Sequence, residues 1–362
     1  MVAAAALAAA AGAPPTAADG QRHDLLATLN SRQLAGERVI YSYPGRNPPQ
    51  SLLAQIAAGD AAGVILFKDN IVSASQIAQV TSELQTAAAR SPVKTPLLIM
   101  TDQEGGQVRR LPGQPILSEK QIGQSADPGP EAALAGRGAG AALKSVGVNV
   151  NLAPVLDVYR QPGDFIDRYG RSYSAHPAAV ARLGADFIRA QQQAGVAATA
   201  KHFPGLGAAA RGQNTDRAPV RLNVSLSRLR SWDEAPYRSA IAARVKLVMV
   251  SWAVYPAIDP RRPAGLSADV VRELRQHLRF RGLTITDALG AGALRHYGST
   301  SRRAVLAAGA GMDLLLCASQ QVSQGTAAVG ALSRALTNGS LRAPAFTASV
   351  QRVLALRRNL SR

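Results

Sequence analysis

The sequence predicts one α/β domain of the (β/α)8 barrel class, a closed parallel sheet surrounded by helices. Short continuous apolar runs alternate with longer segments of helical period, which is typical of parallel strands buried on both faces. Nearly every run ends in a polar residue, and no glycine-rich dinucleotide fingerprint follows the early runs. With 362 residues and 47% hydrophobic content, the chain can fill one large barrel core.

The strands are expected in the apolar runs and the helices between them. Seven apolar runs are clear, and there is room for an eighth strand at 39–41. The seven clear runs are 63–67, 97–102, 148–154, 198–203, 247–252, 283–287 and 312–316. Residues at positions three and four apart are apolar in the intervening segments, which indicates amphipathic helices. The expected helices are 74–89, 132–146, 177–194, 226–244, 268–278 and 301–310.

The polar strand ends indicate where the chemistry lies. Because the carboxyl ends of barrel strands meet at one rim, side chains that follow different strands come together there. The most informative segment is 198–207, in which an apolar run gives way to Lys201 and His202 and then to a Pro-Gly loop. The other polar strand ends are Lys68-Asp69, Asp102, Asp157, Ser251 and Asp287.

Charge and cysteine content exclude some classes of protein. The chain has 41 Lys and Arg against 23 Asp and Glu, a net charge of +18, which favours anionic surfaces. The basic residues are scattered, without the interleaved aromatics of nucleic-acid platforms, so no nucleic-acid partner is expected. The cluster at 352–358 is expected to be a solvated helix face. Cys317 follows three leucines and is expected to be a buried apolar side chain; one cysteine allows neither an intramolecular disulfide nor a cysteine zinc site.

The chain is expected to divide into an N-terminal segment and the barrel. The N-terminal segment is residues 1–24; its first 18 residues are mostly alanine and end in small residues and prolines, which resembles a secretory signal without its basic region. Residues 25–362 then form the barrel. The segment favours a secreted or envelope protein, and the alternative is a flexible tail on a cytoplasmic one. No later stretch is long and apolar enough to span a bilayer.

Four blocks of the sequence carry a specific resemblance. They are DQEGGQVRRL at 102–111, GVNVNLAPVLDV at 147–158, KHFPGLG at 201–207 and GLTITDAL at 282–289. In this order and at these strand ends they resemble glycoside hydrolase family 3, of the single-domain bacterial β-N-acetylhexosaminidase type. The similarity runs from about residue 25 to residue 356 and implies the barrel fold.

The resemblance implies a role for each polar strand end. A retaining glycosidase needs a carboxylate that attacks the anomeric carbon, and Asp287 matches the family's nucleophile, although Ala288 replaces an aspartate there. Asp157 and Ser251 are expected to support the site. The positions expected to bind the N-acetylglucosamine ring through charge-assisted hydrogen bonds are Asp102, Arg110, Arg171, Lys201 and His202.

The general acid is where this sequence departs from the family. Hexosaminidases of this type carry Asp-Ser-His on the loop after KHFPGHG, and the histidine transfers the proton. Here Leu206 replaces the loop histidine, and Asn214, Thr215 and Asp216 stand where Asp-Ser-His is expected. Asp216 is therefore a candidate proton donor, supported by Asn214, with a pKa raised by desolvation or by Asp287. The alternative is a loop that lacks catalytic groups in a protein that binds sugars without turnover.

The expected activity is hydrolysis of terminal β-linked N-acetylglucosamine through a covalent intermediate on Asp287. The substrate would be an N-acetylglucosamine-containing oligosaccharide or a peptidoglycan fragment. No metal or organic cofactor is implied, because two protonatable groups and water suffice. Other family 3 specificities, β-glucosidase or β-xylosidase, remain open; those enzymes commonly carry a second domain that supplies the acid, and the chain ends at Arg362. Oligomeric state is not readable from the sequence.

Overall fold

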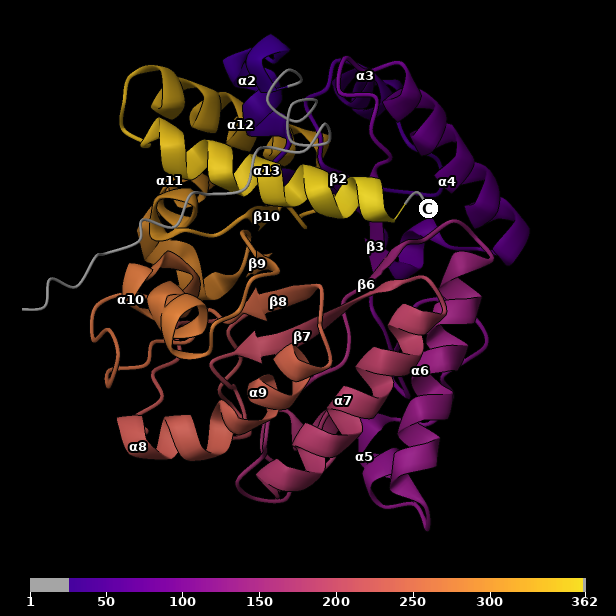
Figure 1. Ribbon diagram of the computed structural model, residues 1–362, viewed down its shortest axis with the longest axis vertical. Helices are drawn as coiled ribbons and strands as arrows, with labels where there is room; N and C mark the ends of the chain where they lie inside the picture. Colours follow the sequence, from indigo (N-terminus) through magenta and orange to yellow (C-terminus); the bar gives the residue numbers. More distant parts are fainter. Residues whose placement is uncertain (1–25, 361–362) are drawn as a thin grey trace, which may run out of the picture.

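The computed structural model describes residues 26–360, which form a closed barrel of parallel strands inside a layer of helices (Figure 1). The strands follow one another around the barrel in the order β1-β10-β9-β8-β7-β6-β3-β2. Their bounds are β1 Val39–Tyr41, β2 Gly63–Ile65, β3 Leu98–Thr101, β6 Val150–Asn151, β7 Ala197–Phe203, β8 Leu247–Val250, β9 Leu283–Ala288 and β10 Leu314–Leu316. All eight overlap the predicted strands, with β7 beginning and β9 ending one residue outside them, and the closed order confirms the (β/α)8 barrel.

A small antiparallel pair is inserted after β3. It consists of β4 (Gln103–Gly105) and β5 (Val108–Arg109), which pair with each other and not with the barrel. The sequence reading missed this hairpin because it is short and polar.

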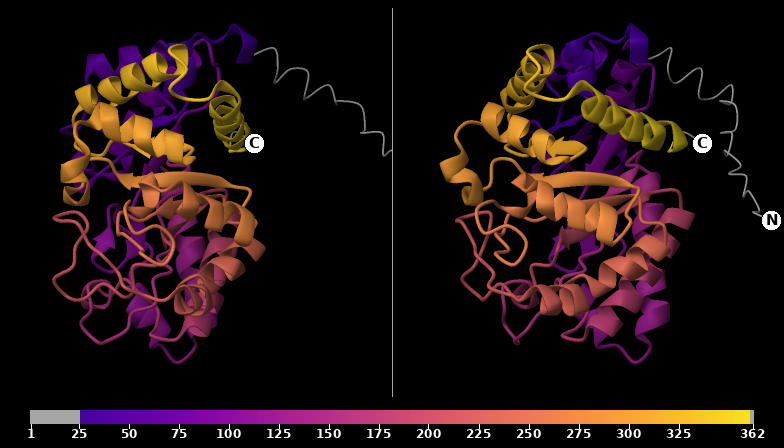
Figure 2. Two further views of the ribbon diagram at one scale, coloured as in Figure 1. Left: turned by 90° about the vertical axis from the view of Figure 1, so that its left-hand side faces the viewer. Right: turned by 60° about the vertical axis from the view of Figure 1, so that its left-hand side comes forward.

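Helices cover the outside of the barrel, as the two side views show (Figure 2). They are α2 Ser31–Gly36, α3 Gln50–Ala57, α4 Ala74–Ala89, α5 Glu119–Gly123, α6 Pro128–Lys144, α7 Pro177–Gln193, α8 Leu226–Arg228, α9 Ala235–Ala242, α10 Ala268–Arg272, α11 Thr300–Ala310, α12 Val322–Thr337 and α13 Ala343–Asn359. Local signals set several ends: the Ser73 hydroxyl accepts the Gln76 N–H at the start of α4, and Gly311 ends α11 with φ +102°.

Two of the predicted helices are interrupted. The segment expected to be one helix over 226–244 contains a π-helical turn, η3 (Leu229–Asp233), between α8 and α9. The segment over 268–278 continues from α10 into a second π-helical turn, η5 (Glu273–His277). Each turn shifts the side chains that follow it by one position around the helix.

Helix α13 closes one end of the barrel. Its Val353 and Leu356 belong to the same apolar cluster as side chains of all eight strands (Figure 1). The expected solvated face at 352–358 is wrong for Arg357, which is buried and forms an ion pair with Glu37 just before β1. Arg357 also donates to the carbonyls of Thr95 (2.6 Å) and Pro96 (2.8 Å). A helix laid across the amino ends of the strands must satisfy these groups, so its arginine cannot be solvated.

Two further expectations concern the rest of the described chain. Cys317 is fully buried, and burial raises the pKa of its thiol to about 12, as expected of an apolar side chain. Within residues 26–360, no helix has both the length and the hydropathy needed to cross a bilayer. The expected N-terminal segment 1–24 lies outside the described residues.

Candidate active site

The expected site residues lie at the carboxyl ends of the barrel strands, as parallel topology requires. Asp102 directly follows β3, Lys201 and His202 lie in the second half of β7, and Asp287 is the penultimate residue of β9. Strand β7 is built from small residues over Ala197–Ala200, so the sheet passes close beneath the polar pair.

Lys201 is the centre of a buried charge network. Its side chain is 2% exposed, and its Nζ lies 2.7 Å from Asp102 Oδ1 and 2.7 Å from Glu104 Oε1. Arg171 donates from Nε and Nη2 to the two carboxylate oxygens of Glu104, both at 2.8 Å. The network therefore places two cations and two carboxylates within one set of contacts at the rim.

The charges of the network shift one another's pKa. Burial alone would raise the pKa of Glu104, but Arg171 and Lys201 outweigh it and lower the pKa to about 2. Burial alone would lower the pKa of Lys201, but Asp102 and Glu104 raise it. Glu104 and Lys201 are therefore both charged at neutral pH.

Asp102 is the member of the network that faces outward. Its side chain is 15% exposed against 2% for Glu104, and its second oxygen lies 3.8 Å from Arg110 Nη2. Arg110 follows β5, and its Nε is buried without a hydrogen-bond partner. An outward carboxylate held by a lysine and flanked by an arginine is well suited to bind vicinal hydroxyl groups.

His202 is oriented by Asp157, which follows β6 and is fully buried. Asp157 Oδ2 lies 2.7 Å from His202 Nδ1, while Oδ1 accepts the N–H of His202 (3.2 Å) and of Leu206 (2.6 Å). The Asp157 carbonyl also accepts the Ser172 hydroxyl (2.6 Å), which ties in the loop that carries Arg171. Asp157 thus positions both the imidazole and the loop after β7.

Asp216 and Asp287, the two predicted catalytic carboxyls, lie on segments that are hydrogen-bonded to each other. Asp287 is half-buried, and its Oδ1 accepts the N–H of Ala288 (2.7 Å). Asp216 is exposed on the loop after β7, and Gly292 and Ala293 donate backbone N–H groups to the carbonyls of Asp216 (2.8 Å) and Thr215 (2.9 Å). These bonds fix the Asp216 loop to the loop that follows Asp287.

The Asp216 carboxyl has a raised pKa. Although part of the side chain is exposed, partial desolvation and then the charge of Asp287 raise the pKa of Asp216, while His202 and Arg171 act in the opposite direction. Asp102 adds a further upward contribution. The structure therefore brings Asp216 within electrostatic reach of Asp287, His202, Arg171 and Asp102.

The remaining expected residues have structural contacts. Asn214 Oδ1 accepts the backbone N–H of Asp216 (2.8 Å). Ser251 is buried after β8, where its hydroxyl contacts the Tyr255 hydroxyl (3.2 Å) and accepts the N–H of Ala253 (2.9 Å). Tyr255 in turn donates to the Gly205 carbonyl (2.9 Å), so Ser251 acts on the loop after β7 through Tyr255.

A comparison with known protein families agrees with this geometry. The model described as "Glycosyl hydrolase family 3 N terminal domain" matches residues 30–356. The chain belongs to glycosyl hydrolase family 3. It is therefore a glycoside hydrolase, as the four sequence blocks indicated.

Individual family 3 relatives agree over most of the chain. A protein of Arthroderma benhamiae described as an uncharacterized secreted glycosyl hydrolase is 46% identical over 90% of this chain and 93% of its own. A Beta-hexosaminidase of Xanthomonas axonopodis pv. citri is 36% identical over 74% of this chain and 80% of its own.

Solved family 3 structures have the same fold. A beta-N-acetylglucosaminidase from Paenibacillus sp. superposes with a TM-score of 0.87 at 35% identity, covering 92% of this chain and 64% of that one. A Beta-N-acetylhexosaminidase from Beutenbergia cavernae gives a TM-score of 0.82 at 30% identity, covering 91% of this chain and 99% of that one.

Two acidic residues of this family 3 site were missed by the sequence reading. Glu104 is part of the DQEGG block but was given no role, although it holds both Arg171 and Lys201. Its position two residues after Asp102 puts both side chains on one face of an extended chain, which is the signal that could have found it. Glu119, fully buried at the start of α5, accepts the N–H of Val155 (2.8 Å), and burial followed by Glu104 raises its pKa well above the ordinary value.

Proposed function

We propose that this glycoside hydrolase removes terminal β-linked N-acetylglucosamine with retention of configuration, through a covalent intermediate on Asp287. The hexosaminidase and N-acetylglucosaminidase relatives support the sugar. The observation that supports the mechanism is the pair of backbone hydrogen bonds that join the Asp216 loop to the loop after Asp287, together with the charge of Asp287, which raises the pKa of Asp216.

The sugar ring binds to the charge network in this proposal. Asp102 accepts hydrogen bonds from hydroxyl groups of the sugar. Lys201 holds Asp102 in place directly, and Arg171 supports Lys201 through Glu104. His202 uses Nδ1 for Asp157, which leaves Nε2 for the sugar. Arg110, with an unpaired buried Nε, supplies a further donor.

The reaction then proceeds in two displacements. Asp287 attacks the anomeric carbon while Asp216 donates its proton to the glycosidic oxygen, so the leaving group departs as an alcohol. Asp216 then takes a proton from water, which attacks the anomeric carbon and releases Asp287. Every proton lost by Asp216 in the first step is regained in the second.

The test compares leaving groups in Asp216→Ala. With a dinitrophenyl β-N-acetylglucosaminide, departure needs no proton, so glycosylation should be almost unchanged; with chitobiose, kcat/KM should fall by about 10²- to 10⁴-fold. Azide should restore turnover and yield a β-glycosyl azide. Asp127→Ala, which removes an exposed carboxyl without a hydrogen bond to α6, is the matched control. Equal small losses on both substrates would remove Asp216 from the mechanism.

The nucleophile is tested separately. A 2-fluoro or epoxide glycoside should leave an adduct that mass spectrometry locates on Asp287. Rates on nitrophenyl N-acetylglucosaminide, glucoside and xyloside decide the sugar, and a faster glucoside or xyloside would overturn the N-acetylglucosamine assignment. Sugar binding without an adduct or turnover would identify a binding protein instead.

We also propose that residues 1–24 direct export and that residues 25–362 are the catalytic domain. The alanine-rich composition of 1–24 and the secreted description of the Arthroderma relative support this. Expression with and without residues 1–24 in a bacterial host should give export of the longer chain only. Retention of both chains in the cytoplasm would refute it.

A further inference from the structure

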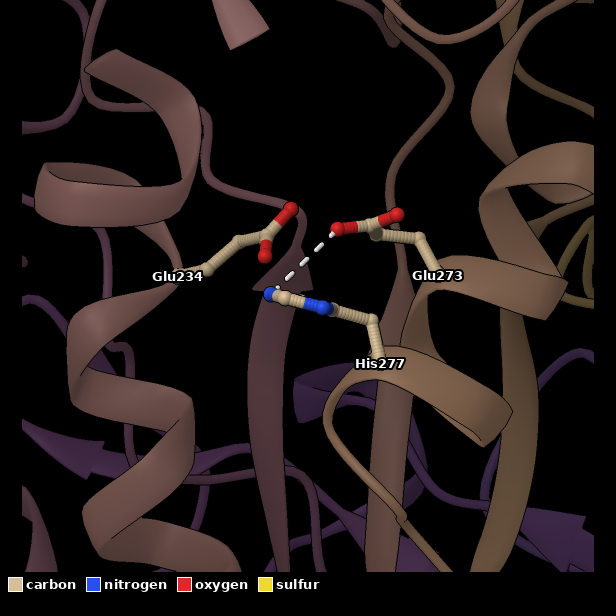
Figure 3. A group of neighbouring side chains, drawn as sticks. All are labelled: Glu234, Glu273 and His277. Carbon is tan, nitrogen blue, oxygen red and sulfur yellow. Dashed lines mark ion pairs between the residues drawn. The ribbon is translucent and has the colours of Figure 1, made fainter. Parts of the chain in front are cut away.

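Three side chains with metal-binding chemistry meet in the helical layer. Glu234 precedes α9, and Glu273 and His277 lie four residues apart on η5 (Figure 3). One oxygen or nitrogen of each residue lies within 4.8 Å of the others. None of the three has a role in the proposed glycosidase chemistry.

Glu234 is the anomalous member of this cluster. The residue is 0% exposed, and neither of its carboxylate oxygens has a hydrogen-bond partner. Figure 3 shows its carboxylate pointing toward Glu273 and His277. A buried carboxylate without hydrogen bonds is unfavourable unless it is neutralised by a proton or a cation, so it indicates a missing partner.

Both glutamates are placed by π-helical turns, which are rare and frequent at functional sites. The turn η3 ends with the Glu234 N–H donating to the Leu229 carbonyl (2.9 Å). The turn η5 ends with the Leu278 N–H donating to the Glu273 carbonyl (3.1 Å). The two turns face each other, and the cluster lies between them.

We propose that Glu234, Glu273 and His277 bind a divalent transition-metal ion of the Zn²⁺ type and thereby join α9 to η5. Two carboxylate oxygens and one imidazole nitrogen suit Zn²⁺ better than Ca²⁺ or Mg²⁺, which prefer oxygen ligands alone. Bond lengths of about 2.0–2.2 Å place tetrahedral ligands about 3.4 Å apart, so side-chain shifts of about 1 Å close the site.

A cleft adjoins two of the three proposed ligands, Glu273 and His277, while Glu234 does not line it. It has a volume of about 330 Å³, and its lining includes Glu273, His277, Arg230 and Ile258. His277 lies at the surface while Glu234 lies beneath it. A metal bound by three protein ligands can therefore take a water molecule from the cleft as its fourth.

Two arginines supply positive charge to His277 and Glu273. Arg238 Nη2 donates to His277 Nε2 (3.0 Å), which shows that this nitrogen presents a lone pair. Arg230 contacts both oxygens of Glu273, at 2.7 and 3.0 Å. The metal must displace Arg238 from His277, so removing Arg238 should strengthen metal binding.

The direct test measures Zn²⁺ binding to the purified full chain after treatment with a chelator. We expect one site whose affinity is unchanged in Asp287→Asn, since Asp287 lies at the rim and outside this cluster. Glu234→Gln and His277→Gln should each weaken that site at least about tenfold, and Arg238→Gln should tighten it. Glu83→Gln, an exposed change of the same kind on α4, should leave it unchanged.

The proposal is overturned if the parent binds no Zn²⁺, or if the Zn²⁺ affinities of Glu234→Gln and His277→Gln stay within twofold of that of the parent. Because His277 is exposed, its variant decides the question even if Glu234→Gln does not fold. Zn²⁺ should also raise the Tm of the parent and not that of His277→Gln.

Discussion

The carboxylate of Glu104 should contribute strongly to stability, in a way that depends on pH. Glu104→Gln keeps the size of the side chain but removes the charge that Lys201 and Arg171 share. Lowering the pKa of this carboxyl from 4.5 to about 2 corresponds to about 3 kcal/mol of stability at neutral pH. Breaking a buried ion pair costs a similar amount, about 3–5 kcal/mol, because two cations stay behind.

The sign of the pH dependence follows from the direction of the shift. A carboxyl with a lowered folded-state pKa stabilises the protein above its unfolded-state pKa, and this contribution is lost as the pH falls through the folded value. The parent should therefore lose the Glu104 contribution between about pH 4.5 and pH 2. The difference between parent and variant should shrink to about 1 kcal/mol near pH 3.

Urea denaturation at pH 7 and pH 3 measures both quantities. Glu83→Gln on the exposed face of α4 is the control, with an expected change within about 0.5 kcal/mol at either pH. A Glu104→Gln loss below about 1 kcal/mol at pH 7, or a loss equal at both pH values, would refute the argument. The variant should also raise KM, because Lys201 and Arg171 lose their fixed positions.

Two further changes test how the loop after β7 is held. In Asp157→Asn, one carboxylate oxygen becomes an NH2 group, so the side chain can no longer accept a hydrogen bond from His202 Nδ1 while its other oxygen accepts two backbone N–H groups. We therefore expect kcat/KM on a nitrophenyl glycoside to fall about 10- to 100-fold. A thermal melt checks that the Tm stays near that of the parent; unchanged kcat/KM in a folded variant would contradict the role. In Gly207→Ala, the new Cβ would lie 2.0 Å from the Val158 carbonyl oxygen, so the loop must shift and activity and Tm should both fall. Gly212→Ala meets nothing within 4 Å and should behave like the parent, and equal effects of the two changes would refute the packing argument.

The strands could be predicted because their burial on both faces requires apolar residues at successive positions. A parallel strand buried on both faces is a short continuous apolar run, and Leu247–Val250 and Leu314–Leu316 show this directly. Strand ends follow from the same pattern, so the sequence alone predicts that Asp102, Lys201 and Asp287 lie at one rim.

Helix α13 shows what the pattern could not reveal. Arginines near the end of a chain usually indicate a solvated helix face, yet Arg357 is buried against Glu37 and two carbonyls. Those partners lie before β1 and β3, far away in the sequence. Only the closed barrel brings them under one helix end, so no local pattern carries the information.

Glu104, and Glu234 of the proposed metal cluster, could not be predicted for a similar reason. Glu104 takes its role from Arg171, which lies on a separate loop, and Glu234 takes its surroundings from η5. In both cases the partner comes from another βα unit. A π-helical turn adds a further difficulty, because it moves Glu234 by one position relative to the regular helical period.

A carboxyl group in place of the family's histidine would also make the two steps of the proposed reaction self-adjusting. Before attack, the charge of Asp287 helps to keep the proton on Asp216, as a general acid requires. Once Asp287 is esterified by the sugar, that charge is gone, and the pKa of Asp216 should fall while His202 and Arg171 still favour its anion. The same group is then ready to act as the base toward water. Trapping the 2-fluoro adduct and titrating Asp216 by carbon NMR should show this fall, and an unchanged pKa in the adduct would mean that Asp287 does not control Asp216.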